Sequence, residues 1–377
     1  MTGSPLRVAF AGLAHSHPYT DAANVRALGA EVVGVHDADA VAAEAFAARF
    51  GGVVASSVGE LTAVRPDLVI ATPLPHEVVP FLQELGGGTV PVFVNKVIAA
   101  TAGQFAAVDS AVAASAVPVG TGSVLRFAPA LAAFAAGLSA DEVLSIRVLA
   151  QHDNAAFLSS RSSRSPRSPL NTPAPVALSV ARSSPERQEM RREQGGRGVP
   201  ECEGQDDRER GWQDDPERGG RGLRERGWQD DPERGGGTLV TVGVHAWEMV
   251  DVLLPGAALV AGSGWTRTRA GSETASEDAA GVDGHLRLPD AEREVPVQVL
   301  VTGTPGPDAY AVDVVTAAGI RSLSLDVDDA NEALGFRGLI RALLDAAPRG
   351  VAVAPWAEAR VVVENTVLAA GIARGDR

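Results

Sequence analysis

Lys96 is the only lysine in the chain: it stands among 33 basic residues, and all the others are arginine. Arginine stays protonated at any working pH, whereas the amine of a lysine can be tuned to release and take up a proton. Lys96 follows the apolar run 90–94, which predicts a buried parallel strand, so it lies at the carboxyl end of that strand. Ligands of open α/β sheets bind at these ends. The position therefore indicates proton chemistry at Lys96, with an ordinary surface lysine as the alternative.

A turn near the N-terminus could hold a dinucleotide. The first predicted strand leads into Ala11-Gly12-Leu13-Ala14-His15-Ser16-His17. A strand-to-helix turn of this kind aims backbone N–H groups at a pyrophosphate. The glycine fingerprint is weakened, because Ala14 and His17 stand where its second and third glycines would be.

Asp37 strengthens the dinucleotide hypothesis. It ends the second predicted strand, about 25 residues beyond Gly12, where a carboxylate can accept both ribose hydroxyls of NAD. No Lys or Arg follows it closely to receive a 2′-phosphate, so NAD is favoured over NADP. The alternative is a cap for the helix predicted to begin at Ala40, a role that Asp39 could fill equally well.

Two more motifs contain candidate site residues. Thr72-Pro73-Leu74-Pro75-His76 follows the strand predicted over 67–71. This rigid turn could form the floor under a nicotinamide ring, and His76 could bind the cofactor or cap the next helix. His245 lies in an apolar helix, where a lone histidine is usually a core residue; its combination with Lys96 favours a catalytic role.

Residues 6–120 alternate short β-branched runs with Ala-rich stretches, which predicts βαβ units and a parallel sheet covered on both faces. The predicted strands are 6–11, 30–36, 67–71, 90–95 and 117–120, and the predicted helices are 18–28, 40–50, 76–85 and 102–114. We assign residues 1–122 to a doubly wound Rossmann domain.

Residues 123–377 predict an α+β domain on a largely antiparallel open sheet. Its predicted strands are 143–151, 258–268, 281–288, 295–301, 309–316 and 321–325, with a strand or turn entering an apolar helix over 238–254 and further helices over 330–344 and 356–373.

A polar segment, residues 159–223, interrupts the second domain. It has only six Leu, Ile, Val or Phe among its 65 residues, too few to offset the entropy of ordering it, so we predict a disordered insertion. Residues 208–220 recur unchanged as 224–236, which indicates a local duplication. The insertion is either a functional addition or an accident of the gene or its sequence.

Composition narrows the class of protein. The formal charge of −14 argues against nucleic acid or an anionic membrane as partner. We expect no signal peptide, because residues 1–6 have no basic region that leads into a long apolar stretch, and the sequence has no uninterrupted apolar run of membrane-spanning length. The lone Cys202 offers neither a disulfide nor a zinc site, and no metal is expected. We expect a cytoplasmic protein.

Together the motifs resemble the Gfo/Idh/MocA family, named for glucose–fructose oxidoreductase and inositol dehydrogenase. Beyond the residues above, Arg126-Phe127-Ala128-Pro129 is similar to the family's Arg-Phe-x-Pro. The segment from Trp228 to the triple glycine at 235–237, followed by His245, is similar to its Trp…Asp-Pro…Gly-Gly-Gly and histidine helix. The resemblance covers the chain except 159–223.

The resemblance implies an NAD(P)-dependent oxidoreductase that acts on a sugar, polyol or related small hydroxyl or carbonyl compound. Lys96 would hold or polarise the substrate hydroxyl, and His245 would take its proton as general base. By the same resemblance Asn95 would lie against the cofactor, Arg126, Trp228 and Thr241 would face the substrate, and the C-terminal sheet would join copies into a homo-oligomer.

Two departures from the family pattern bear on catalysis. The family's Glu-Lys-Pro is Asn95-Lys96-Val97, and its Asp four residues before the histidine is Thr241. The loss of two carboxylates leaves Lys96 with less counter-charge, which favours the neutral amine. The alternative function is therefore a catalytically silent NAD-binding sensor or scaffold protein of the same fold.

Overall fold

The computed structural model describes residues 4–13, 15–152, 231, 234–268, 276–289 and 293–375. The predicted insertion at 159–223, Ala14 of the predicted dinucleotide turn and Trp228 lie outside these residues.

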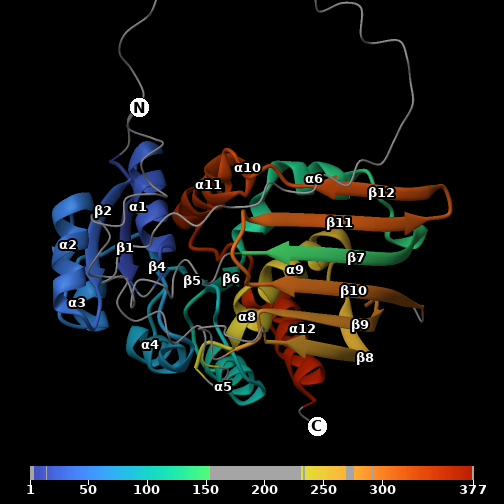
Figure 1. Ribbon diagram of the computed structural model, residues 1–377. Helices are drawn as coiled ribbons and strands as arrows, with labels where there is room; N and C mark the ends of the chain where they lie inside the picture. The colour runs from blue at the N-terminus through green and yellow to red at the C-terminus, as the bar shows by residue number, and fades with distance from the viewer. Residues whose placement is uncertain are drawn as a thin grey trace, which may run out of the picture. The chain divides into compact units, whose positions relative to one another are not determined.

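The first half of the chain forms a six-stranded parallel sheet (Figure 1). Its strands are β1 (Arg7–Ala11), β2 (Glu31–His36), β3 (Val53–Val54), β4 (Leu68–Ala71), β5 (Val92–Asn95) and β6 (Val119–Gly122). They lie in the order β3-β2-β1-β4-β5-β6. The chain therefore adds β2 and β3 on one side of β1, and then β4, β5 and β6 on the other side. The point of reversal, between β1 and β4, is where doubly wound sheets bind dinucleotides.

Helices cover both faces of this sheet, as the alternating sequence pattern predicts. They are α1 (His17–Ala27), α2 (Ala40–Phe50), α3 (Val58–Ala63), α4 (Val78–Leu85) and α5 (Ala102–Ala113), with the short 3₁₀ helix η1 (Pro75–Glu77) before α4. Successive strand residues point to opposite faces. Val8 and Phe10 of β1 accordingly pack in one core with α1 and α2, while Ala9 and Ala11 belong to a second core with α3, α4 and α5.

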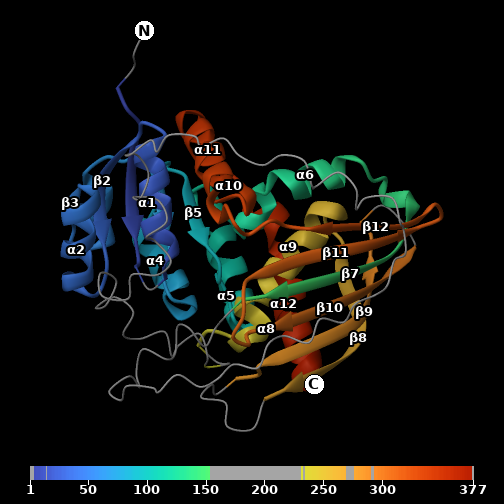
Figure 2. The same ribbon diagram turned by 45° about the horizontal axis from the view of Figure 1, so that its top comes forward.

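The second half forms a mixed, mostly antiparallel sheet, which confirms the predicted fold class. Its strands are β7 (Val143–Gln151), β8 (Ala258–Arg267), β9 (Ala279–Arg287), β10 (Glu294–Thr302), β11 (Ala309–Thr316) and β12 (Gly319–Ser324). Their order is β12-β11-β7-β10-β9-β8, and only β7 and β10 run parallel. Helices lie against one face of this sheet (Figure 2).

Two helical segments differ from the prediction. The strand or turn expected near residue 238 is wrong: α8 (Gly237–Thr241) and α9 (Gly243–Leu253) follow each other directly. All residues of α8 are buried. Its β-branched residues suggested a strand, but here they fill a helix that is packed on every side. The helix expected over 330–344 is broken into α10 (Ala330–Ala333) and α11 (Phe336–Ala346). Gly335 lies between them with φ +90°, and a Cβ there would fall 2.4 Å from the Val124 carbonyl oxygen.

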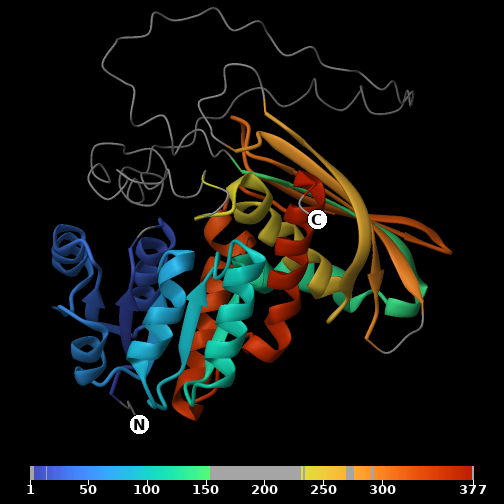
Figure 3. The same cartoon turned by 90° about the horizontal axis from the view of Figure 1, so that it is seen from below.

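Three elements join the sheets: η2 (Val124–Phe127), α6 (Pro129–Ala136) and α12 (Trp356–Arg374). α12 packs on β8 and β9 of the second sheet and on α5 and β6 of the first (Figure 3). The chain before α12 also pairs with β6, where the Thr121 N–H donates to the Ala354 carbonyl. The carboxyl end of β6 is thereby held against the start of α12. Within the described ranges, no helix combines the length and apolar character needed to cross a membrane.

Candidate active site

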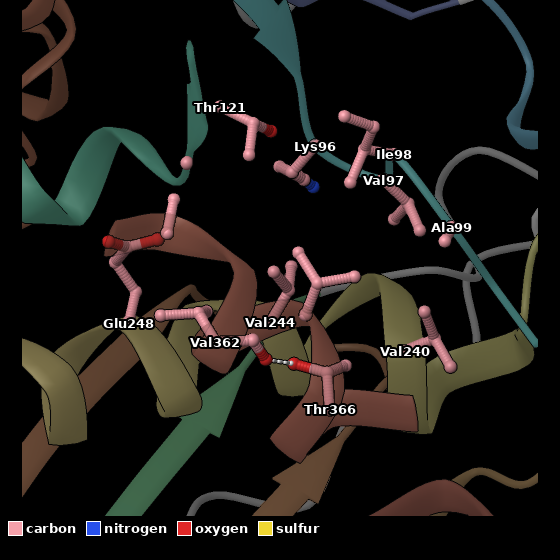
Figure 4. Close-up of a pocket in the computed structure, with 13 residues that line it drawn as sticks. Lys96, Val97, Ile98, Ala99, Thr121, Val240, Val244, Glu248, Val362 and Thr366 are labelled. Carbon is pink, nitrogen blue, oxygen red and sulfur yellow. Dashed lines mark hydrogen bonds between the residues drawn. The ribbon is translucent and has the colours of Figure 1, made fainter. Parts of the chain in front are cut away.

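Lys96 lies immediately beyond β5 and is 7% exposed. Its Nζ donates to the main-chain carbonyl of Thr241 in α8, at 3.4 Å. The Lys96–Val97 peptide bond is cis. Lys96 also lines a cavity of about 10 Å³, together with Glu248 and the apolar side chains of Val240 and Val244 (Figure 4). A space of this size holds about one water molecule.

His245 is buried in α9. Its Nδ1 lies 2.6 Å from the Ser123 hydroxyl, and its ring centroid lies 5.5 Å from that of Tyr310 in β11. Burial lowers the pKa of His245 well below its usual range, and the charges of Lys96 and of two other histidines, His152 and His17, lower it further. His245 is therefore neutral at pH 7 and can accept a proton.

Thr241 contributes its backbone to this site. Its carbonyl accepts the hydrogen bond from Lys96 Nζ, while its hydroxyl donates to the Gly237 carbonyl one turn earlier, at 2.8 Å. The predicted substrate contact through the hydroxyl would require that bond to break.

Arg126 of η2 is held by two carboxylates of α9, Glu248 and Asp251. Glu248 is fully buried; burial raises its pKa, and the Arg126 charge opposes that rise. The predicted substrate contact of Arg126 would compete with both ion pairs. The sequence predicts that Lys96 has less counter-charge than in the family. Glu248 partly replaces it, because it places a carboxyl group in the wall of the Lys96 cavity.

The predicted dinucleotide turn closes tightly onto β4. Gly12 has φ +80°, and a Cβ there would lie 2.5 Å from the Thr72 carbonyl oxygen, so only glycine fits. The Leu13 N–H donates to Asp37 Oδ2 and the Thr72 N–H donates to the Ala11 carbonyl. The structure thus brings the predicted residues Gly12, Leu13, Asp37 and Thr72 together at the carboxyl edge of β1, β2 and β4.

Asp37 is not the cap of α2. Asp39 fills that role: its Oδ1 accepts the N–H groups of Val41 and Ala42. Asp37 is left at the end of β2, where its oxygens accept the backbone N–H groups of Leu13 and Asp39. Burial raises the pKa of Asp37, and the two N–H bonds counteract that effect.

The two turn histidines are buried, and His76 is exposed. The His15 and His17 rings meet edge to face with centroids 4.3 Å apart, and the His17 ring also meets Phe336. His76 lies in η1 beyond Pro73, and it does not cap the next helix: the N-cap of α4 is Glu77, and α4 has no side-chain cap.

Asn95 connects Thr72 to a carboxyl group that the sequence did not point to. Its Nδ2 donates to Asp21 Oδ2 of α1 at 3.0 Å and to the Thr72 hydroxyl at 3.2 Å. Asp21 is completely buried, and burial raises its pKa to about 7. Among the described residues, neither Asp21 Oδ1 nor Asn95 Oδ1 has a hydrogen-bond partner.

Comparison with known proteins establishes the fold. No protein-family model matches the sequence, and no curated protein sequence matches it significantly. Solved structures do match. Myo-inositol dehydrogenase from Corynebacterium glutamicum superposes with a TM-score of 0.65 at 12% identity, over 99% of this chain and 98% of that one. The chain has the fold of the inositol dehydrogenases.

Two solved structures of the same fold contain a cofactor. Myo-inositol dehydrogenase from Lactobacillus casei, in complex with NAD(H) and myo-inositol, has a TM-score of 0.65 at 14% identity and covers 99% of this chain and 94% of that one. GenD2 from gentamicin A biosynthesis, in complex with NAD, has a TM-score of 0.67 at 17% identity, over 100% of this chain and 96% of that one. The fold implied by the family resemblance is confirmed.

Sequence reasoning missed Asp21, Ser123, Glu248 and Tyr310. Only Glu248 left a signal, because it lies three residues after His245 and so shares a face of the same helix. Among the described residues, no cluster of His, Cys, Asp or Glu is arranged to hold a metal ion.

Proposed function

We propose that this protein is an NAD-dependent oxidoreductase that transfers a hydride between the nicotinamide and a sugar, polyol or related small hydroxyl or carbonyl compound. One observation carries the proposal. Lys96, at the carboxyl end of β5, donates to the Thr241 carbonyl one turn before the buried His245, and its charge lowers the pKa of that histidine. Solved structures of the same fold support the proposal: an inositol dehydrogenase with NAD(H) and myo-inositol bound, and GenD2 with NAD bound.

The residues at the sheet edge fit NAD. Asp39 caps α2, which leaves the Asp37 side chain at the end of β2 for the ribose hydroxyls that we propose it binds. Asn95 Oδ1, buried and without a partner among the described residues, suits a ligand group that donates a hydrogen bond. The proposed cofactor residues are Gly12, Leu13, Ala14, His15, Asp37, Thr72, Pro73, His76 and Asn95. When bound, NAD supplies the acceptor or donor of the hydride.

Lys96 and His245 have different roles in the proposed reaction. The Lys96 ammonium holds the substrate hydroxyl oxygen and stabilises the negative charge that grows on it. His245 takes the hydroxyl proton on Nε2, since Nδ1 faces Ser123. As the carbonyl forms, the carbon loses its hydrogen with the bonding electrons as hydride, so one proton and one hydride leave the alcohol. The low pKa of His245 keeps it ready to accept the proton near neutrality. Arg126, Trp228 and Thr241 remain the predicted substrate contacts.

A panel of polyols and sugars, assayed for reduced nicotinamide by absorbance, tests this function. We expect turnover with NAD⁺ that Lys96→Ala abolishes while NAD⁺ binding survives. NAD⁺ binding without turnover on any compound of the panel would instead support the sensor or scaffold alternative.

We also propose that copies of the chain associate through the open face of the second sheet. Three large apolar side chains, Leu149, Trp265 and Ile320, are 38%, 45% and 69% exposed on its strands. Association of two copies through this face would remove these side chains from water. Light scattering on the wild type and on Ile320→Glu should show an oligomer that the charged variant weakens; a monomeric wild type would contradict the proposal.

A further inference from the structure

Ser123 follows β6 and is completely buried at the junction of the two halves. Its hydroxyl lies 2.6 Å from His245 Nδ1 and accepts the Leu125 N–H at 3.1 Å. Its own N–H donates to Glu248 Oε2 at 2.8 Å. Glu248 lies on α9 one turn after His245. The two bonds therefore hold Ser123 against both residues of this helix.

A neutral imidazole carries its proton on one nitrogen only. His245 can act as a base through Nε2 only when the proton lies on Nδ1. A buried Nδ1–H without an acceptor would be unfavourable, which would favour the other tautomer. The Ser123 hydroxyl is the group placed to accept this proton. Thr241, one turn before His245, uses its hydroxyl on Gly237.

We propose that Ser123 is a positioning residue for His245: its hydroxyl accepts a hydrogen bond from Nδ1–H, fixes the ring, and leaves Nε2 unprotonated toward the substrate. The inference rests on the proposed function, because it takes His245 as the base. After proton transfer the same bond stabilises the imidazolium, since Nδ1–H is retained.

Kinetics of Ser123→Ala test the positioning role. We expect kcat to fall about 10- to 100-fold, the size typical of a misplaced catalytic group, while KM for NAD⁺ changes less than about threefold. Ser123→Thr keeps the hydroxyl and should recover much of the loss. Thr316→Val is a matched control, because the Thr316 hydroxyl likewise accepts the N–H two residues later but lies at the far end of β11. It should keep wild-type kcat.

A measurement without turnover separates this inference from the proposed function. In protein with ¹⁵N-labelled histidine, the His245 signals are identified by their loss in His245→Gln. The wild type should show the Nδ1–H tautomer, and Ser123→Ala should shift it toward Nε2–H. An Nε2–H tautomer in the wild type would overturn the role of Ser123. So would unchanged kcat in Ser123→Ala beside an inactive His245→Gln. A wild type without turnover would contradict the proposed function and leave the tautomer measurement to decide on Ser123.

Discussion

Asp21 should make the folded protein less stable as the pH rises, and Asp21→Asn should remove this dependence. The Asp21 carboxyl is completely buried and its pKa is raised from 3.8 to about 7 by burial, against the opposing effect of the Asn95 hydrogen bond. Between these two values the folded state holds a proton that the unfolded chain has released. The contribution of Asp21 to the unfolding free energy is therefore greatest below pH 3.8 and is lost as the pH rises toward 7.

The size of the effect follows from the pKa difference. A shift of about three units at about 1.36 kcal/mol per unit gives roughly 4 kcal/mol between pH 4 and pH 7. An amide at position 21 cannot ionise. The unfolding free energy of Asp21→Asn minus that of the wild type should therefore rise by about 2 kcal/mol over the upper half of this window, from about pH 5.5 to pH 7. Above pH 7 this difference should level off.

Urea unfolding followed by tryptophan fluorescence at several pH values measures this difference. Asp109→Asn is a suitable control, because Asp109 is a partly exposed carboxylate that also accepts a side-chain hydrogen bond, from Trp356. It reports the background that the loss of one carboxylate produces. A difference between wild type and Asp21→Asn that is independent of pH would refute the protonated, buried state of Asp21. A difference that shrinks as the pH rises would refute it as well.

Further predictions concern the cofactor and the catalytic pair. Lys96→Ala should lower kcat at least about 100-fold with a near-normal Kd for NAD⁺; a collapse of NAD⁺ binding would show that Lys96 holds the cofactor instead. Asp37→Ala should weaken NAD⁺ binding about tenfold or more, or about 1.4 kcal/mol. The ratio of NAD⁺ affinity to NADP⁺ affinity should also fall. Calorimetry that finds no change in NAD⁺ affinity would exclude Asp37 from the ribose site. Gly12→Ala would place a Cβ 2.5 Å from the Thr72 carbonyl oxygen, so both Tm and NAD⁺ affinity should fall. Because the pKa of His245 is lowered, the acid limb of kcat/KM should lie well below pH 6.5; a limb at or above that value would contradict its role as the base.

Most elements of the fold were predictable from local sequence. β7, β11 and α2 have the bounds that their patterns predict, because each is a regular run between clear turn or capping residues. β3, with two residues, is too short to leave a pattern. α3 was missed although Ser57 and Glu60 form the start signal of a helix: the Ser57 hydroxyl accepts the Glu60 N–H.

The candidate site likewise contains residues that the local sequence indicates and residues that it does not. Lys96, His245 and Asp37 stand out by residue type and by position at a strand end or in an apolar helix. Their partners do not: Asp21 meets Asn95 across 74 residues, and Ser123 meets His245 across 122. Such contacts depend on how the two sheets and α9 come together, which no local pattern encodes. The predicted domain boundary at residue 122 and the predicted insertion at 159–223 remain predictions.

Calorimetric titration of the purified 377-residue chain with NAD⁺ and with NADP⁺ is the direct test of the proposed cofactor site. We predict micromolar binding of NAD⁺ and much weaker binding of NADP⁺, because Asp37 would accept the ribose hydroxyls and repel a 2′-phosphate. Absence of binding for both would contradict the cofactor assignment and, with it, the catalytic roles of Lys96 and His245.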